Sequence, residues 1–278
     1  RFLAMVKFIK MHGLGNDFII IEKSNDIKVT KDLVKNLSNR IKGIGCDLVV
    51  FLNDGDGKIF DLKADFFNSD GSKAEVCGNA LRCIGKFFCN KLKKNNLVVE
   101  TESGIVDIEM IEDEKISVDI GIPKFRWNEI PMSKNLDTEN LDLKLNYLKG
   151  GFAVNVGNPH IIFFSNKIDK EKFLQDSKKI SNSKIFPQGI NISLVEIKSK
   201  EEINIITFER GAGLTNACGT GACASVIACH KLNLCNNNVR VKMIGGELDI
   251  EISPDNHIFM IGEAKEVFQG EFELKEFS

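Results

Sequence analysis

Alternating apolar and polar positions recur along most of the chain. Alternation over about four to eight residues places the apolar side chains on one face of a β-strand. The pattern is clearest in NLVVETESGIVDIEMI (96–111), KISVDIG (115–121), FAVNVGNPHIIFF (152–164), NISLVEI (191–197), EINIITF (202–208) and VRVKMIGGELDIEIS (239–253). These stretches predict a protein rich in β-sheet.

Two stretches break the alternation and predict helices. GNALRCIGKFFCNKL (78–92) follows Cys77, and GTGACASVIACHKL (219–232) follows Cys218. Both are small or apolar around most of the helix circumference and end in basic residues, which suits the negative end of the helix dipole. A helix that is apolar on nearly all sides lies inside its domain. We therefore expect a sheet wrapped around one central helix, twice.

The two predicted helices belong to an internal repeat. Each cysteine follows an asparagine by about sixty residues, 61 in the first copy (77 − 16) and 60 in the second (218 − 158), and follows a second polar residue by nine (77 − 68 and 218 − 209). The matching residues are Asn16, Asn68 and Cys77 in the first copy, and Asn158, Glu209 and Cys218 in the second. A long unit that occurs twice predicts two pseudo-symmetric domains rather than a solenoid.

This organisation predicts an α+β fold of two domains. Each would be a mixed β-sheet or barrel around a central helix that starts at a cysteine, with the active site in the cleft between the domains. We expect residues 5–121, with the C-terminal segment 266–278, to form the half that carries Cys77. Residues 122–265 would form the half that carries Cys218.

Composition narrows the functional classes. The chain has 278 residues, of which 43% are hydrophobic and 27% charged, and a net charge of −2. Scattered lysines and this charge argue against a nucleic-acid surface. No apolar stretch approaches the about 18 residues of a membrane span, and no secretory signal is evident, so we expect a cytoplasmic protein with neither nucleic-acid nor membrane partners. The eight cysteines lack C-x-x-C or His-pair spacing, which predicts thiols and no metal site.

A cysteine at a helix start suggests acid–base chemistry. The free backbone N–H groups and the dipole there bind a carboxylate or stabilise a thiolate, although the dipole lowers a thiol pKa by only about one unit. A neighbouring group must help, and His160 and Glu209 are the nearest candidates. Two such cysteines on opposite faces of a carbon would exchange its proton, which is racemisation or epimerisation. Neither HGLGND nor GIGCDL completes a dinucleotide motif, and no lysine stands out for pyridoxal phosphate, so we expect no cofactor.

Seven motifs in order resemble the diaminopimelate epimerase family, from Met5 to about Gly270. They are FIKMHGLGNDF, GIGCD, NSDGSKAEVCGNALRC, VGNPH, FPQGINISLVE, FERGAGLTNACGTGACAS and GGELDIEI. The resemblance implies cofactor-independent epimerisation of LL-2,6-diaminopimelate to the meso form by a thiolate/thiol pair, in lysine and peptidoglycan precursor biosynthesis. It also implies a small-molecule amino-acid substrate and a homodimer.

The same resemblance assigns roles to individual residues. Cys77 and Cys218 would be the acid–base pair, and His160 and Glu209 would tune their pKa values. Substrate binding would fall to the helix starts and to polar residues around them: Gly78, Asn79, Gly219 and Thr220 for the reacting carboxylate, and Asn16, Asn68, Asn158, Asn191, Glu209 and Arg210 for the remaining polar groups.

Plain alternatives stand beside these roles. The asparagines next to glycines could be turn residues, His160 a core histidine, and Glu209 with Arg210 a local ion pair. The six other cysteines are interpreted as packing residues: Cys46, Cys83, Cys89, Cys223, Cys229 and Cys235.

The sequence also departs from the family pattern. Leu48 stands where the family usually has glutamine, which removes one polar substrate contact, whereas VCGNALRC for MCGNGARC and GLT for GET are interpreted as packing changes. The alternative functions are a racemase or epimerase of proline, hydroxyproline or histidine on the same scaffold, and a non-catalytic amino-acid-binding protein.

Overall fold

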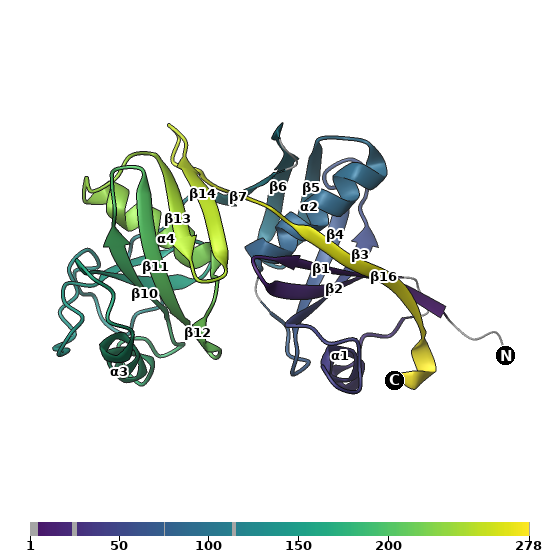
Figure 1. Ribbon diagram of the computed structural model, residues 1–278, viewed down its shortest axis with the longest axis horizontal. Helices are drawn as coiled ribbons and strands as arrows, with labels where there is room; N and C mark the ends of the chain where they lie inside the picture. The colour runs from purple at the N-terminus through teal and green to yellow at the C-terminus, as the bar shows by residue number, and fades with distance from the viewer. Residues whose placement is uncertain (1–4, 24–26, 75, 113–114, 278) are drawn as a thin grey trace. The chain divides into compact units, whose positions relative to one another are not determined.

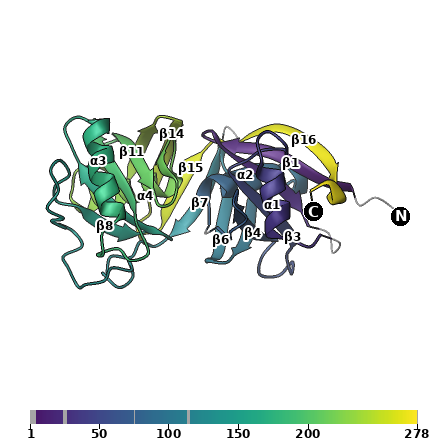
Figure 2. The same ribbon diagram turned by 90° about the horizontal axis from the view of Figure 1, so that it is seen from below.

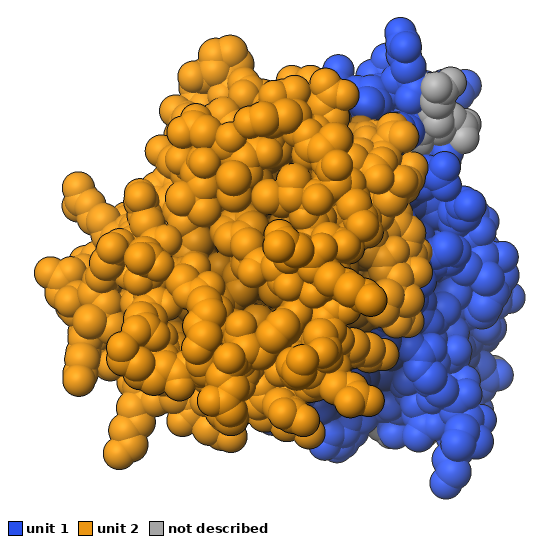
Figure 3. Space-filling view, turned by 60° about the vertical axis from the view of Figure 1, so that its left-hand side comes forward, with its two compact units in different colours: residues 1–118, 262–278 blue, residues 119–261 orange. Residues whose placement is uncertain are grey.

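The computed structural model describes residues 5–23, 27–74, 76–112 and 115–277. The chain divides into two compact units, one formed by Arg1–Val118 with Gly262–Ser278 and the other by Asp119–Ile261 (Figure 3). The chain leaves the first unit within one strand, Ile116–Gly121, and returns at the end of another, Ile258–Gly262. Each unit is a mixed sheet with few helices.

In the first unit, the central helix α2 (Gly78–Leu92) packs against β1, β2, β5, β6 and β16 (Figure 1). The strand order is β16-β1-β2-β3-β4-β5-β6-β7, with β2–β3 and β4–β5 parallel. The elements are β1 (Met5–Gly13), β2 (Asn16–Glu22), α1 (Lys31–Ser38), β3 (Leu48–Asp54), β4 (Leu62–Asn68), β5 (Asn96–Thr101), β6 (Gly104–Met110), β7 (Ile116–Gly121), β16 (Lys265–Glu273) and the 3-10 helix η2 (Leu274–Glu276).

In the second unit, α4 (Gly219–Lys231) takes the same place and packs against β8, β9, β10, β11, β13 and β14. The order is β15-β14-β13-β11-β10-β9-β8, with β12 paired to β11 and with β9–β10 and β11–β13 parallel. The elements are β8 (Phe152–Asn155), β9 (Pro159–Phe164), α3 (Lys170–Ser181), β10 (Asn191–Ile197), β11 (Glu202–Glu209), β12 (Gly213–Thr215), β13 (Asn238–Met243), β14 (Gly246–Ile252) and β15 (Ile258–Gly262).

An outer helix covers a second core in each unit (Figure 2). Leu33, Val34 and Leu37 of α1 join apolar residues of β1–β3, and Phe173 and Ile180 of α3 join those of β8–β11. Each helix begins at a capping side chain, since Thr30 accepts from Leu33 N and Asp169 accepts from Lys172 N. A cap of this kind satisfies one of the free N–H groups of the first turn.

These features confirm the α+β fold, the mixed sheets and the helices that begin directly after Cys77 and Cys218. The barrel is wrong, because the sheets do not close. Among the described residues, β16 does not pair with β7, and β15 does not pair with β8. Each helix is therefore enclosed by a curved, open sheet. Within the described part of the chain, no helix is long and apolar enough to cross a membrane.

Candidate active site

Cys77 lies at the start of α2, with an extended backbone (φ −108°, ψ 108°). Its sulfur is half-buried and donates a hydrogen bond to Asn16 Oδ1 at 3.6 Å. The same oxygen accepts from Asn79 Nδ2 at 3.3 Å. The first unit thus brings together three of the predicted site residues, from the start of β2 and the first turn of α2.

Cys218 occupies the matching place at the start of α4, but it is only 4% exposed. Its sulfur accepts from Gly221 N at 3.3 Å and lies 3.6 Å from Thr220 Oγ1. Burial raises the pKa of the Cys218 thiol well above its ordinary value, and the negative charge of Glu209 raises it further. The hydrogen bonds of Thr220 and Gly221 lower this pKa, but by less. Cys218 is therefore a thiol at neutral pH.

His160 is fully buried and reaches Cys218 through a hydroxyl. Its Nε2 lies 2.9 Å from Asn158 Oδ1 and 3.1 Å from Thr220 Oγ1. Its Nδ1 has no hydrogen-bond partner among the residues that the structure describes. Burial lowers the pKa of His160 to about 3, with a further contribution from the charge of Arg210, so the imidazole is neutral at pH 7. A neutral ring can orient the Thr220 hydroxyl, but it is too weak a base to deprotonate a thiol.

Other predicted substrate ligands make hydrogen bonds to their own unit. The Asn191 amide donates to Pro159 O at 3.1 Å and accepts from Arg210 N at 2.9 Å. Arg210 Nη1 donates to Gln188 O at 3.1 Å, and its chain passes so close to Gly189 that a Cβ there would lie 2.8 Å from Arg210 Cδ. Asn191 therefore links the backbone at Pro159 to the backbone at Arg210.

Glu209, Asn68 and the residues at the two helix starts complete the set of predicted site residues. Glu209 Oε1 accepts a hydrogen bond from Thr215 Oγ1. Asn68 donates to Ser72 Oγ at 3.0 Å within the turn after β4, as its sequence context allows. Gly78, Asn79 and Gly219 are buried, and Thr220 is half-buried. Asn16 contacts the start of α2 and His160 the start of α4, whereas the described side-chain hydrogen bond of Asn68 lies within its own turn.

Strand register shows that the two units repeat at the level of single positions. Phe18 pairs with Leu48 and Leu48 with Asn68 in the first unit, while His160 pairs with Asn191 in the second. Leu48 and Asn191 therefore occupy equivalent positions next to β2 and β9. The polar side chain present in one unit is replaced by a half-buried leucine in the other.

Sequence reasoning missed two charged residues beside Cys77. Arg82 is fully buried on α2 and donates from Nη2 to Asn79 Oδ1 at 2.8 Å. Asp47 accepts from Asn16 Nδ2 at 2.8 Å. The signals were an arginine within an otherwise small and apolar helix, and an aspartate in the GIGCD motif. Gly13 leaves room for the guanidinium, since a Cβ there would lie 3.0 Å from Arg82 Nη2.

Solved structures place the chain in a known fold class. It is similar to a probable proline racemase from Agrobacterium radiobacter K84, with a TM-score of 0.71 and 12% identity over 95% of this chain and 92% of that one. It is also similar to a phenazine biosynthesis protein of the PhzF family from Bacillus anthracis, with a TM-score of 0.67 and 17% identity over 97% and 99%. The fold is therefore that of the two-domain PhzF and proline racemase proteins.

Sequence comparison identifies the family within this class. The diaminopimelate epimerase family model matches residues 8–126 and 152–267. The diaminopimelate epimerase of Zymomonas mobilis is 38% identical over 98% of both chains. That of Methanocaldococcus jannaschii is 40% identical, over 95% of this chain and 97% of that one. The chain belongs to the diaminopimelate epimerase family and is an isomerase. The other racemases match far less well in sequence.

Proposed function

We propose that the chain interconverts LL-2,6-diaminopimelate and meso-diaminopimelate, in lysine and peptidoglycan precursor biosynthesis. The observation that carries the proposal is the pair of cysteines at the starts of the two enclosed helices, one in each repeat unit. Binding alone requires no thiol at either position. Family membership supplies the substrate, and the two thiols supply the acid and the base.

The proton balance of the reaction assigns a role to each sulfur. A thiolate takes the α-proton from one face of the carbon, and a thiol gives a proton to the other face, so the two cysteines exchange protonation states in each turnover. Cys218 is a buried thiol in the resting protein. We propose that its proton passes to the Glu209 carboxylate when the thiolate forms, because that carboxylate hydrogen-bonds the Cys218 side chain. Cys77 is then the thiol that donates.

The helix starts supply the electrostatic support. When the α-proton leaves, negative charge spreads onto the α-carboxylate of the substrate. Backbone N–H groups at a helix N-terminus stabilise such charge, and we propose that Gly78 with Asn79 and Gly219 with Thr220 provide them. Asn16, Asn68, Asn158, Asn191, Glu209 and Arg210 are proposed to bind the remaining polar groups, where the Arg210 guanidinium suits a carboxylate.

We further propose that the protein acts as a cytoplasmic homodimer without a cofactor. The family resemblance supports each of these statements. Sedimentation of the purified chain tests the dimer, which a monomer at micromolar concentration would refute.

The central test is incubation of the reduced protein with LL-diaminopimelate in D₂O without added cofactor. We expect deuterium at the α-carbon and meso product in the wild type, and loss of both in Cys77→Ser and Cys218→Ser. Full activity after stoichiometric alkylation of Cys218 would overturn the two-thiol mechanism. If the wild type shows no exchange, the same assay with proline, hydroxyproline and histidine separates another racemase from a binding protein.

A further inference from the structure

A directional chain of hydrogen bonds runs through the amides beside Cys77. Arg82 Nη2 donates to Asn79 Oδ1 at 2.8 Å, Asn79 Nδ2 donates to Asn16 Oδ1 at 3.3 Å, and Asn16 Nδ2 donates to Asp47 Oδ2 at 2.8 Å. A guanidinium has only donors and a carboxylate only acceptors. The two charged ends therefore permit one orientation of each amide between them. In this orientation Asn16 Oδ1 faces the thiol of Cys77.

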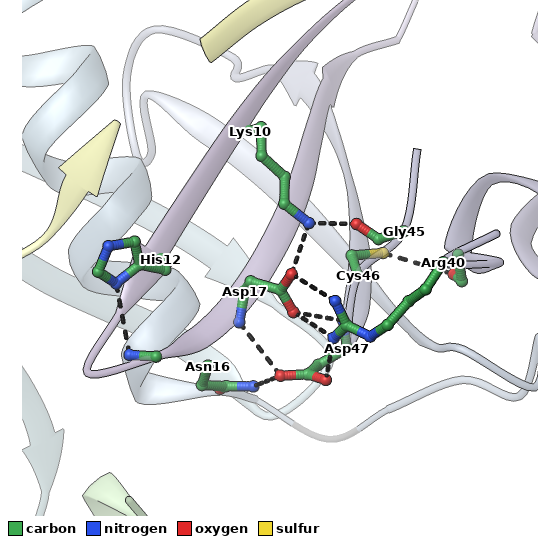
Figure 4. A network of polar contacts seen from close by, with 10 residues as sticks. Lys10, His12, Asn16, Asp17, Arg40, Gly45, Cys46 and Asp47 are labelled. Atoms are coloured by element: carbon green, nitrogen blue, oxygen red, sulfur yellow. Dashed lines mark hydrogen bonds and ion pairs between the residues drawn. The ribbon is translucent and has the colours of Figure 1, made fainter. Parts of the chain in front are cut away.

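Asp47 itself is bound on the other side by Asp17 and Arg40 (Figure 4). Its backbone N–H donates to Asp17 Oδ1 at 3.0 Å, and its Oδ2 also accepts from Asp17 N at 3.2 Å. Its Oδ1 accepts from Arg40 Nη2 at 2.7 Å. The carboxylate facing Asn16 thus accepts one backbone N–H and one ion pair, and the Asp47 backbone N–H makes a further bond to the Asp17 side chain.

Asp17 anchors this arrangement in the sheet. It lies 2.6 Å from Lys10 Nζ, which is 9% exposed, and it accepts two bonds from Arg40. Burial raises the pKa of Asp17, but the hydrogen bonds and charges of Arg40 and Lys10 lower it more, so the net pKa lies well below the usual range. Asp17 therefore stays ionised across the pH range in which a thiol titrates, and its carboxylate remains an acceptor for the Asp47 N–H there.

From this network we propose that Asp47 is a positioning residue for the reaction: it fixes the Asn16 amide so that its oxygen accepts the Cys77 S–H and holds Cys77 as the proton-donating thiol. The inference rests on the proposed function for the role of Cys77. Without Asp47 only the Asn79 Nδ2 bond, at 3.3 Å, holds Asn16 Oδ1 in place, and the amide can turn to present Nδ2 to the sulfur. A donor there favours the thiolate, whereas an acceptor favours the thiol.

A pair of variants separates the acceptor from the ion pair. Asp47→Ala removes both the oxygen that Asn16 binds and the charge that Arg40 binds. Asp47→Asn removes the charge but keeps an amide oxygen, which the two donors Asn16 Nδ2 and Asp17 N draw toward them. The charged groups around the cluster, Lys10, Asp17, Arg40 and Arg82, are unchanged in both variants.

The first readout is the pH dependence of Cys77 alkylation by iodoacetamide without substrate, followed by mass spectrometry of the Cys77 peptide. We expect the midpoint to move to lower pH in Asp47→Ala, with alkylation about threefold to tenfold faster at pH 7, as one lost hydrogen bond implies. Asp47→Asn should stay within about twofold of the wild type. Asn16→Ala should abolish the difference that Asp47→Ala makes.

The second readout is epimerisation. We expect kcat/KM of Asp47→Ala to fall about tenfold, by the same factor in both directions because the equilibrium constant is independent of the enzyme. An unchanged alkylation profile in Asp47→Ala, or an equal change in Asp47→Asn, overturns the proposal. A wild type that alkylates as expected but does not epimerise diaminopimelate overturns the proposed function instead, and leaves the role of Asp47 toward Cys77 supported.

Discussion

Replacing Gly221 by alanine tests whether the start of α4 is built around the Cys218 sulfur. Gly221 lies in the first turn of the helix, and its N–H donates to Cys218 Sγ. A Cβ at this position would lie 2.9 Å from Thr207 Oγ1 and 3.2 Å from Cys218 Sγ. Both distances are shorter than ordinary contacts, so a neighbour must move by a few tenths of an ångström.

Two opposing contributions set the effect on stability. Alanine is favoured over glycine in a helix by about 1 kcal/mol, while crowding a packed site costs about 1–3 kcal/mol. The net change in the free energy of unfolding is therefore a loss of about 0–2 kcal/mol. Under the proposed mechanism the effect on rate is larger, because the Cys218 sulfur would be displaced from the α-carbon, and small misplacements cost on the order of 10² in rate. We expect kcat to fall about tenfold to a hundredfold.

The assay combines urea unfolding with the D₂O epimerisation assay on the same preparation. Thr207→Ala is the matched control: it removes the nearer contact and also the hydrogen bond to Ser193 Oγ. Adding Gly221→Ala to it should therefore cost less stability than in the wild type, but should still lower the rate, since the Cβ still presses on the sulfur. Full kcat in Gly221→Ala, together with a gain of about 1 kcal/mol in stability, would refute the reasoning. That result would mean that the site accommodates the added Cβ without displacing the sulfur.

Three further predictions follow from burial and charge. Asp17→Asn should lower the free energy of unfolding at pH 7 by about 2–4 kcal/mol, because it leaves a buried cation without its partner. The difference from the wild type should shrink as the pH falls below 3.8, the ordinary pKa of the carboxyl group. Asp249→Asn, on an exposed ion pair, should cost under about 1 kcal/mol. Iodoacetamide should modify Cys77 before Cys218, since the first is half-buried and the second 4% exposed with a raised pKa, and equal rates would contradict this. NMR of labelled His160 should show a neutral ring from pH 8 to about pH 5, because its pKa is lowered from 6.5 to about 3. Burial of this ring should then destabilise the fold as the pH falls below 6.5. A titration midpoint near 6.5 in the folded protein would contradict the assignment.

The sequence predicted the features that depend on local pattern. Alternation located β5–β11, β13 and β14, and a run of small and apolar residues after each cysteine located α2 and α4. The spacing repeat predicted two similar units, and the two central helices do begin at its two cysteines. Resemblance to the family then named the activity.

The structure of the segment between the two repeats could not be predicted from the pattern of apolar residues. Residues 122–151 form no helix or long strand among the described elements, yet Ile130, Met132, Leu141 and Leu148 fill the core beneath α3. These residues have no regular period, so nothing in the sequence marks them as core. The family model also passes over residues 127–151.

Side-chain partners were equally hidden. Whether Asn16 contacts Asp47 depends on the parallel register of β2 and β3, which pairs Phe18 with Leu48. The buried state of Arg82 depends on Gly13 of a neighbouring strand. Spacing along one strand or helix cannot predict a contact that two distant segments make.

Equivalent positions in the two units show how one scaffold surrounds its two thiols differently. Asn16 and Asn158 are equivalent by position, but Asn158 is bound by His160 and Asn16 by Asp47. The position equivalent to His160 is Phe18, which offers no hydrogen bond, so the first unit needs another partner for its asparagine. The sulfurs differ accordingly: Cys218 accepts an N–H from its own helix, whereas the Cys77 side chain makes no such cap bond and donates to Asn16. A reaction that removes a proton on one face and adds one on the other needs a base and an acid at the same moment. We propose that repeating the backbone while changing the neighbours of each sulfur supplies both during turnover.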